Sequence, residues 1–284
     1  MYYRIWFSRI EISNRIKIKL LEKYTEKELY FLEKDVLENF GLKQKEIEKI
    51  LDGNLKGEYN NKLIKIMEEE KIRCLRYTDN EYPYILSQIP DFPVYLFVKG
   101  NLNILNNESY AIVGSRKASL FGVRCANAIA YNIAKDNINV VSGLALGIDA
   151  AAHLGALRLG YGKTIAVLGN GLLEEDFYPK ENLNIYKEIL NKEGAIVSEY
   201  IIFTKPNKYH FPARNRIISG LSSKVIVVEA AEKSGSLITV DFALEQGRDV
   251  YAVPGNICDL NSKGTNKLIK EGAKVLTEYE DLKL

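Results

Sequence analysis

The sequence predicts an α/β protein in which a small helical domain precedes a doubly wound, mainly parallel sheet. Two observations carry this prediction. Residues 1–75 are rich in Lys, Glu, Ile and Leu at helical spacing and contain few glycines, which is typical of a small helical bundle. From Tyr110 onward, short apolar segments alternate with helical segments, which is the pattern of parallel βαβ units.

The helical domain is expected to span residues 1–75 and the sheet domain residues 76–284. Residues 35–51 read as a helix, a glycine turn and a second helix. This pattern suits a helix-hairpin-helix or SAM-like module, and it suits a plain αα-hairpin better. Residues 81–100 carry three prolines and then a β-rich run, which predicts a linker that leads into an edge strand.

The alternating region predicts seven strands with helices between them. The expected strands are 111–113, 139–142, 164–168, 195–198, 224–229, 249–253 and 274–277. The expected helices include 121–135, 148–159, 183–192, 237–246 and 266–271. Ligands of such sheets gather at the carboxyl ends of the strands, so a binding site is expected along that edge.

Glycines and small polar residues follow several of these strands. Gly114, Ser115 and Arg116 lead through Ser119 into a helix, which places free backbone N–H groups and a fork-shaped cation where anions bind. For this segment alone, an ordinary strand–helix turn is an equal alternative. Related turns occur at residues 142–147, which include Gly143 and Gly147, at residues 169–171, and at Ser234, Gly235 and Ser236. Their recurrence predicts an edge that binds phosphates.

A segment free of acidic residues lies between Glu199 and Glu229. It contains the cations Lys205, Lys208, Arg214, Arg216 and Lys224, with Tyr209 and Phe211 among them. Cations interleaved with exposed rings suit single-stranded nucleic acid, because the cations contact phosphates and the rings stack on unpaired bases. The alternative is that Phe211 anchors the core and the arginines cap a helix.

Composition narrows the classes of function. The formal net charge is +2, so a polyanion site must arise from local clustering. Three scattered cysteines fit buried thiols of a reducing compartment, and two histidines argue against a His-based metal centre. The sequence shows neither a signal peptide nor an apolar run that could cross a membrane. We therefore expect a cytoplasmic protein without a metal or a membrane partner.

Nucleotide and catalytic signatures are sparse. No GxGxxG motif occurs, so no dinucleotide cofactor is expected. Asp149 and His153 could face the same side of one helix as an acid–base pair, but a helix cap and a packed histidine are favoured. No catalytic residue is therefore assigned.

Seven motifs in order resemble the DprA/Smf family. They are GSRKAS, SGLALGIDAAAH, AVLGNGLLEEDFYPKEN, GAIVSEY, FPARNRIISGLSS, VVEAAEKSGSLIT and ALEQGRDVYAVPGNI, and the resemblance spans about residues 82–273. It implies a Rossmann-like domain that binds single-stranded DNA and loads the recombinase RecA onto it. It also implies a homodimer that protects and processes DNA taken up during natural transformation.

The resemblance also implies roles for individual residues. Gly114, Ser115 and Arg116 would form the phosphate-binding turn, while Lys208 and Phe211 would supply a backbone cation and a stacking ring. Arg214, Asn215 and Arg216 would extend the basic surface, and Ser234, Gly235 and Ser236 would form another part of the edge that binds DNA. The dimer contact would be made by Leu268 and Ile269. Many relatives carry a C-terminal winged-helix-like domain, which is not expected in this chain.

Two other classes of function stay open from the sequence. One is a nucleotide phosphoribohydrolase of the LOG type, whose sheet is similar but whose PGGxGT signature has no counterpart in residues 229–236. The other is a nucleotide-sensing module without catalysis.

Overall fold

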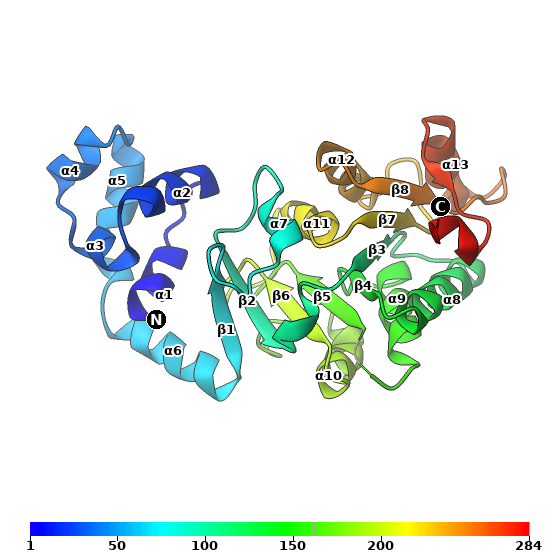
Figure 1. Ribbon diagram of the computed structural model, residues 1–284, viewed down its shortest axis with the longest axis horizontal. Coiled ribbons are helices and arrows are strands. Elements are labelled where there is room, and N and C mark those ends of the chain that lie inside the picture. Colours follow the sequence, from blue (N-terminus) through cyan, green and yellow to red (C-terminus); the bar gives the residue numbers. More distant parts are fainter. Residues whose placement is uncertain (162, 284) are drawn as a thin grey trace.

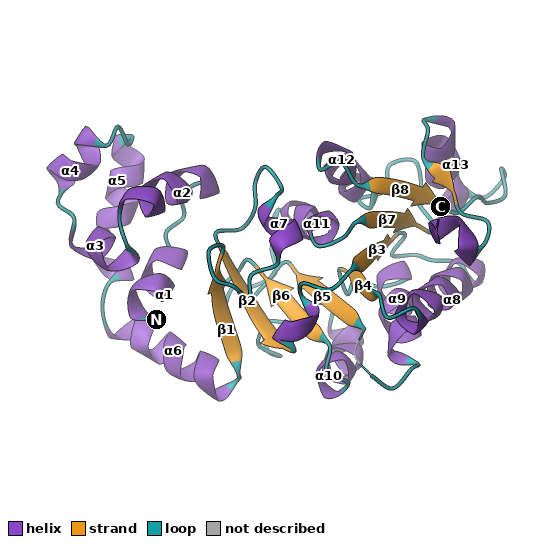
Figure 2. Ribbon diagram, in the orientation of Figure 1, coloured by secondary structure: helices purple, strands orange, loops and turns teal. Residues whose placement is uncertain are grey.

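The computed structural model describes residues 1–161 and 163–283, and it places a helical unit beside one large sheet (Figure 1; Figure 2). The helical unit contains α1 (Tyr2–Ser8), α2 (Asn14–Lys23), α3 (Glu26–Phe31), α4 (Lys34–Asn39), α5 (Gln44–Leu51) and α6 (Glu58–Glu69). Trp6, Phe7, Leu20 and Leu29 are fully buried at its centre. The expected helix–glycine–helix pattern is present as α4 and α5, with Gly41 between them at φ 84°.

Nine strands of the described chain form a single sheet. They are β1 (Ile72–Arg76), β2 (Tyr95–Gly100), β3 (Ser109–Val113), β4 (Asn139–Ser142), β5 (Thr164–Leu168), β6 (Ala195–Ser198), β7 (Lys224–Val227), β8 (Asp249–Ala252) and β9 (Lys274–Val275). Their order is β1-β2-β6-β5-β4-β3-β7-β8-β9. All neighbours from β6 to β9 pair in parallel, whereas β2 is antiparallel to both β1 and β6. The predicted fold, a doubly wound and mainly parallel sheet, is confirmed.

Helices cover both faces of the sheet. They are α7 (Tyr84–Ser87), α8 (Leu120–Lys135), α9 (Ile148–Leu157), α10 (Leu183–Asn191), α11 (His210–Gly220), α12 (Leu237–Glu245) and α13 (Lys263–Lys270). Successive residues of β3 face opposite sides of the sheet. Ala111 and Val113 pack with α11 and α12, whereas Tyr110 and Ile112 pack with α8 and α9. This alternation of period two is what a strand buried on both faces requires.

The helical unit and the sheet share a core. Phe7 of α1 and Tyr95 of β2 lie edge to face with ring centroids 6.3 Å apart, and both belong to one buried cluster that extends to α10. The antiparallel strand β1 pairs with β2 from Ile72 onward. The sheet unit therefore begins slightly before the boundary expected at residue 75, which falls inside β1.

The main differences from the sequence prediction lie outside the βαβ units. The strand β2 was expected at the edge of the sheet, but it lies between β1 and β6, and β1 forms the edge. The basic segment after β6 contains α11, a helix that is not among the expected helices named above. Among the described residues, no helix combines the length and the apolar character that a membrane span requires.

Candidate nucleic-acid interface

The order of the strands reverses between β3 and β7. The chain proceeds outward from β3 through β4, β5 and β6, then returns to pair β7 against the other side of β3. In open α/β sheets, a crevice for ligands forms at the carboxyl ends of the strands at such a reversal. The turn that follows β3 and the loop that follows β7 meet there, with the backbone N–H of Ser115 donating to the carbonyl of Glu229 at 2.7 Å.

Two glycines allow the loops at this crevice to approach each other. A Cβ on Gly114 would lie 2.7 Å from the carbonyl oxygen of Glu229 and 2.7 Å from Cγ1 of Ile148. Gly147 has φ 78°, and a Cβ there would lie 2.3 Å from the carbonyl oxygen of Ser115. The turn after β3 is thus packed against the start of α9, and these positions require glycine.

The two serines of this turn are already engaged within the protein. Ser115 is buried, and its Oγ accepts from the N–H of Lys117 at 3.1 Å. Ser119 caps α8 through Gly122 N–H at 3.0 Å, and its hydroxyl donates to the buried carboxylate of Glu229. Ser119 N–H also donates to Glu229 at 2.9 Å. These side chains fix the turn, and the exposed Arg116 and Lys117 are its cations.

Arg116 lies over the ring of Phe211, with its guanidinium carbon 5.8 Å from the ring centroid. Phe211 stands on the first turn of α11 against Gly169, the residue after β5, and its ring centroid is 5.9 Å from that of Tyr178. Phe211 is half-buried, and Tyr178 is 52% exposed. Within the described residues Phe211 belongs to none of the buried apolar clusters. This placement favours a surface ring over the core anchor considered above.

Further exposed cations precede α11. Lys205 and Lys208 are exposed, and neither forms an ion pair with any other described residue. Lys208 Nζ lies 5.0 Å from the ring centroid of Tyr209, whose side chain is 70% exposed. The loop therefore presents charge and an aromatic face to solvent.

Arg214 is not part of an exposed basic wall, as the sequence had led us to expect. It is only 4% exposed, and its guanidinium donates to the carbonyl of Val167 beneath the loop that follows β4. A Cβ on Gly143 would lie 2.1 Å from Nη1 of Arg214, so this glycine admits the guanidinium. Burial lowers the pKa of Arg214 to about 10. The nearby positive charge of Arg116 also lowers this pKa, whereas the negative charge of Asp149 raises it. Arg214 therefore has a structural role, because its buried guanidinium packs against the loop that follows β4 and hydrogen-bonds to β5.

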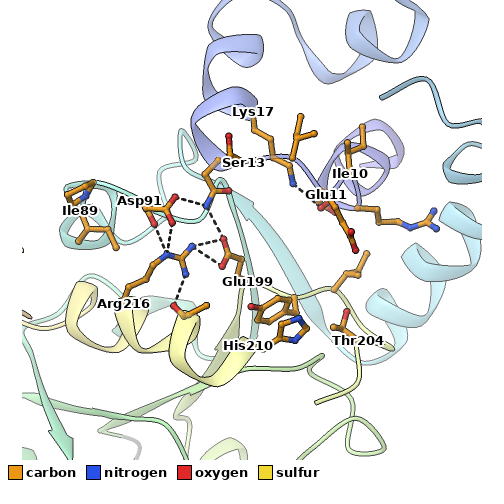
Figure 3. Close-up of a pocket in the computed structure, with 18 of the residues that line it drawn as sticks. Ile10, Glu11, Ser13, Lys17, Ile89, Asp91, Glu199, Thr204, His210 and Arg216 are labelled. Atoms are coloured by element: carbon orange, nitrogen blue, oxygen red, sulfur yellow. Dashed lines mark hydrogen bonds and ion pairs between the residues drawn. The ribbon is translucent and has the colours of Figure 1, made fainter. Parts of the chain in front are cut away.

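Arg216 is also turned inward, toward a groove of about 750 Å³ between the helical unit and the sheet unit. Figure 3 shows it pointing at Asp91 and Glu199. Its Nη2 donates to both carboxylate oxygens of Glu199 at 2.7 and 2.8 Å, and its Nε donates to the carbonyl of Asp91 at 2.8 Å. Burial opposes the charge, but Glu199 and Asp91 hold the pKa of Arg216 above its usual value. The expectation that Arg216 faces DNA is therefore corrected: its charge is neutralised inside the protein.

The same network joins the two units. Asn14 of α2 donates to Asp91 at 3.2 Å and to Glu199 at 3.1 Å. Through Asp91 and Glu199, Arg216 thus connects α11 to α2 of the helical unit. The first turn of α11 also carries Phe211.

The loop after β7 lies at the edge of the crevice. The hydroxyls of Ser234 and Ser236 lie 2.7 Å apart, and Asn215 Nδ2 donates to the carbonyl of Gly235 at 3.4 Å. A Cβ on Gly235 would meet no atom within 4 Å, so this glycine faces open space. The structure brings these three residues and Asn215 to the mouth of the crevice.

The possible acid–base pair is not formed. His153 is fully buried, and its Nδ1 lies 2.7 Å from Oγ1 of Thr164. Asp149 instead accepts from Gly143 N–H at 3.1 Å. Burial lowers the pKa of His153 to about 3, so the imidazole stays neutral. Residues 1–161 and 163–283 contain no group of three His, Cys, Asp or Glu side chains arranged to hold a metal.

Sequence reasoning missed two contributors to this site. Tyr178 lies in a loop after β5, and its ring packs beside that of Phe211. Glu229 accepts hydrogen bonds from the N–H and the hydroxyl of Ser119. The position of Glu229 at the carboxyl end of the strand expected at 224–229 was a usable signal. The position of Tyr178 carried none, because its loop has no regular pattern.

The expected dimer residues lie on different sides of α13. Leu268 packs partly against the core that also contains α11 and α12, whereas Ile269 is half-buried outside that cluster. Ile269 is therefore the better placed of the two for contact with another molecule.

The fold defines a Rossmann-like α/β protein with a crevice at the switch point of its sheet. The chain belongs to the family described as DNA recombination-mediator protein A, whose sequence profile matches residues 73–283.

Individual relatives agree with this assignment. DNA processing protein DprA of Streptococcus pneumoniae is 47% identical over 215 residues, which cover 76% of this chain and 74% of the relative. Protein Smf of Escherichia coli is 46% identical over 201 residues, which cover 71% of this chain and 53% of the relative.

Solved structures extend the similarity to the whole chain. The X-ray structure of DprA from Streptococcus pneumoniae has a TM-score of 0.84 at 39% identity and covers 99% of this chain and 96% of that one. DNA processing protein A from Helicobacter pylori, whose structure concerns its single-stranded DNA binding mode, has a TM-score of 0.67 at 30% identity. That match covers 75% of this chain and 94% of the relative.

Proposed function

We propose that this protein is a recombination mediator that binds single-stranded DNA across the crevice between the β3 turn and the start of α11. The observation that carries the proposal is the contact between Arg116 and Phe211, which places an exposed cation and a flat ring at one point. The relative from Helicobacter pylori, studied for its single-stranded DNA binding mode, supports the choice of ligand.

The path of the strand follows from the exposed groups. Arg116, Lys205 and Lys208 would contact phosphates, and Phe211 with Tyr178 would stack on bases. Because phosphates and stacking carry little information on sequence, binding should be nearly indifferent to base composition.

The test is an anisotropy titration with a single strand and with the matched duplex at several salt concentrations. We expect tighter binding to the single strand, because a duplex hides the base faces that Phe211 would contact. The affinity should fall steeply with salt. Equal affinity for the two forms would defeat the proposal.

We further propose that the protein acts as a homodimer in the cytoplasm, where it protects incoming DNA and loads RecA during natural transformation. All three cysteines are free thiols, which suits a reducing compartment. Two linked DNA sites would raise the effective concentration of the second binding event.

Ile269→Glu tests the dimer by light scattering. The variant should stay folded and show half the mass of the wild type, and Lys19→Glu on the exposed face of α2 is the control. A wild type that is monomeric at high concentration would rule the dimer out.

A further inference from the structure

A second basic surface lies on α8 and α9, on the face of the sheet opposite to α13. Figure 1 shows the two helices side by side at the end of the sheet away from the helical unit. Both helices pack on the core that contains Tyr110 and Ile112, whereas Leu268 of α13 packs on the core of the other face. This surface is therefore separate from Ile269, the residue proposed for the dimer contact.

The two helices carry cations but almost no acids. Residues 114–135 contain no Asp or Glu, and residues 143–161 contain only Asp149, which is buried. Arg124 of α8 and Arg158 of α9 are exposed, and neither lies within 4.0 Å of a carboxylate in the part of the chain that the structure describes. The positive charge of this surface is thus available to a ligand.

Contacts between the two helices position Arg158. Its Nη1 donates to Oδ1 of Asn127 at 3.2 Å, and its guanidinium carbon lies 5.2 Å from the ring centroid of Tyr131. Gly155 lets α9 approach α8 this closely, because a Cβ there would lie 2.3 Å from the carbonyl oxygen of Asn127. A guanidinium that is held in this way keeps further N–H groups with which it can donate to phosphate oxygens.

This surface is continuous with the crevice. The helix α8 begins just after the turn that carries Arg116, and Leu120, Arg124 and Tyr131 fall within about 40° of one another around this helix. Leu120 is 80% exposed and Phe121 is 57% exposed. Apolar surface that is open to solvent therefore separates the cation of the crevice from the cation of α8.

The order of these groups suits a single strand. Each nucleotide of a single strand carries a phosphate and an unpaired base, so its binding surface needs both cations and apolar or aromatic side chains. Away from the crevice, the surface presents in turn Arg116, then Leu120 and Phe121, then Arg124, and about two turns further on Tyr131 with Arg158. A strand that leaves the crevice at the start of α8 meets this series directly.

We infer that the arginine face, defined as Arg124 and Arg158 together with Leu120 and Phe121, binds the part of a single strand that leaves the crevice past Arg116. This inference rests on the proposed function, since it extends the same strand by several nucleotides. It predicts that long strands gain a salt-dependent contribution to affinity that short strands lack.

The test compares the wild type with an Arg124→Gln, Arg158→Gln double variant. Gln has nearly the helix propensity of Arg, so both helices should remain folded. The matched control, Arg15→Gln with Lys62→Gln, removes two exposed cations from α2 and α6. Each protein is titrated against a short oligothymidine of about 6 nucleotides and a long one of about 20, a range typical of single-strand sites. Light scattering measures the mass of each protein.

We expect the double variant to keep the wild-type mass and to bind the short strand as the wild type does. For the long strand, the slope of log affinity against log salt should fall by about 1.4, because about 0.7 is lost with each of two phosphate contacts. The control should change none of these values.

An unchanged slope on the long strand would overturn the inference, leave the proposed function intact and point to another partner for the arginine face, such as an acidic protein segment. An equal loss on both strands would also overturn it, since the arginines would then act at the crevice itself. A lower mass of the double variant would overturn it as well, because the face would then belong to the dimer contact. Failure of the wild type to bind either strand would instead refute the proposed function, and the role of the arginine face with it.

Discussion

The guanidinium carbon of Arg116 lies 5.8 Å from the ring centroid of Phe211, although the two residues come from distant segments of the chain. Among the described residues, no ion pair or side-chain hydrogen bond occupies the guanidinium of Arg116. A free cation beside a half-buried ring offers charge and a flat face to the same stretch of nucleic acid. Charge and stacking at this point can be separated by mutation from the structural roles of Arg214 and Arg216.

Arg116→Ala and Lys208→Ala should weaken the binding of all single strands to a similar degree. Each should reduce the salt slope by about 0.7, because one phosphate contact is lost. Anisotropy titrations over a series of salt concentrations measure both effects. Arg15→Ala and Lys19→Ala, on the exposed side of α2, are the matched controls and should leave the slope unchanged.

Phe211→Ala should cost roughly 1–3 kcal/mol of binding free energy and leave the salt slope nearly unchanged, because a lost stack releases no counterions. Its free energy of unfolding should change little, since the ring lies outside the buried clusters. Phe211→Trp should retain binding. If Phe211→Ala unfolds the protein, the ring is a core anchor and the stacking role is wrong.

Arg216→Ala should show the opposite pattern to Arg116→Ala. Removing this buried cation leaves Glu199 without its partner, which should lower the free energy of unfolding by about 3 kcal/mol. The salt slope of binding should stay that of the wild type. Urea unfolding and salt titration of the same two variants check this contrast, and a reduced slope with full stability would place Arg216 on the DNA.

His153 should make the protein sensitive to mild acid. Its pKa is lowered to about 3 in the folded state, so below the ordinary value of about 6.5 the unfolded chain binds the proton more tightly. Stability attributable to His153 is therefore present above pH 6.5 and is lost as the pH falls toward 3. Between pH 7 and pH 5 this loss should be about 2 kcal/mol.

Urea unfolding of the wild type and His153→Gln at both pH values isolates this effect, because ion pairs elsewhere titrate equally in the two proteins. The variant should lose about 2 kcal/mol less than the wild type between pH 7 and pH 5. Identical losses would show that the imidazole is accessible to protons in the folded protein.

The βαβ part of the fold was readable from the sequence for a clear physical reason. Strands such as β4 and β5 are short, largely apolar runs that are each followed directly by a glycine, and their predicted limits match the structure. The order of the strands was not readable. The switch point between β3 and β7 depends on how the chain returns after β6, and no local pattern records that path.

The basic segment shows where reasoning from charge alone failed. Its lack of acids suggested that all its cations face solvent, yet Arg216 pairs with Glu199, which marks the start of that segment. Likewise, Arg214 enters the interior because Gly143 leaves room for it. Burial of a cation depends on partners that only the tertiary fold brings near. Lys208 and Phe211, which precede these arginines, lie at the surface as expected.

The account is tested most directly by photo-cross-linking a single strand that contains bromodeoxyuridine and mapping the joined peptides by mass spectrometry. We predict cross-links to Phe211 and Tyr178, which flank the crevice with ring centroids 5.9 Å apart. The Phe211 cross-link should disappear in Phe211→Ala and the yield should fall with rising salt. Cross-links confined to the helical unit, residues 1–71, would contradict the assignment of the crevice as the DNA-binding site.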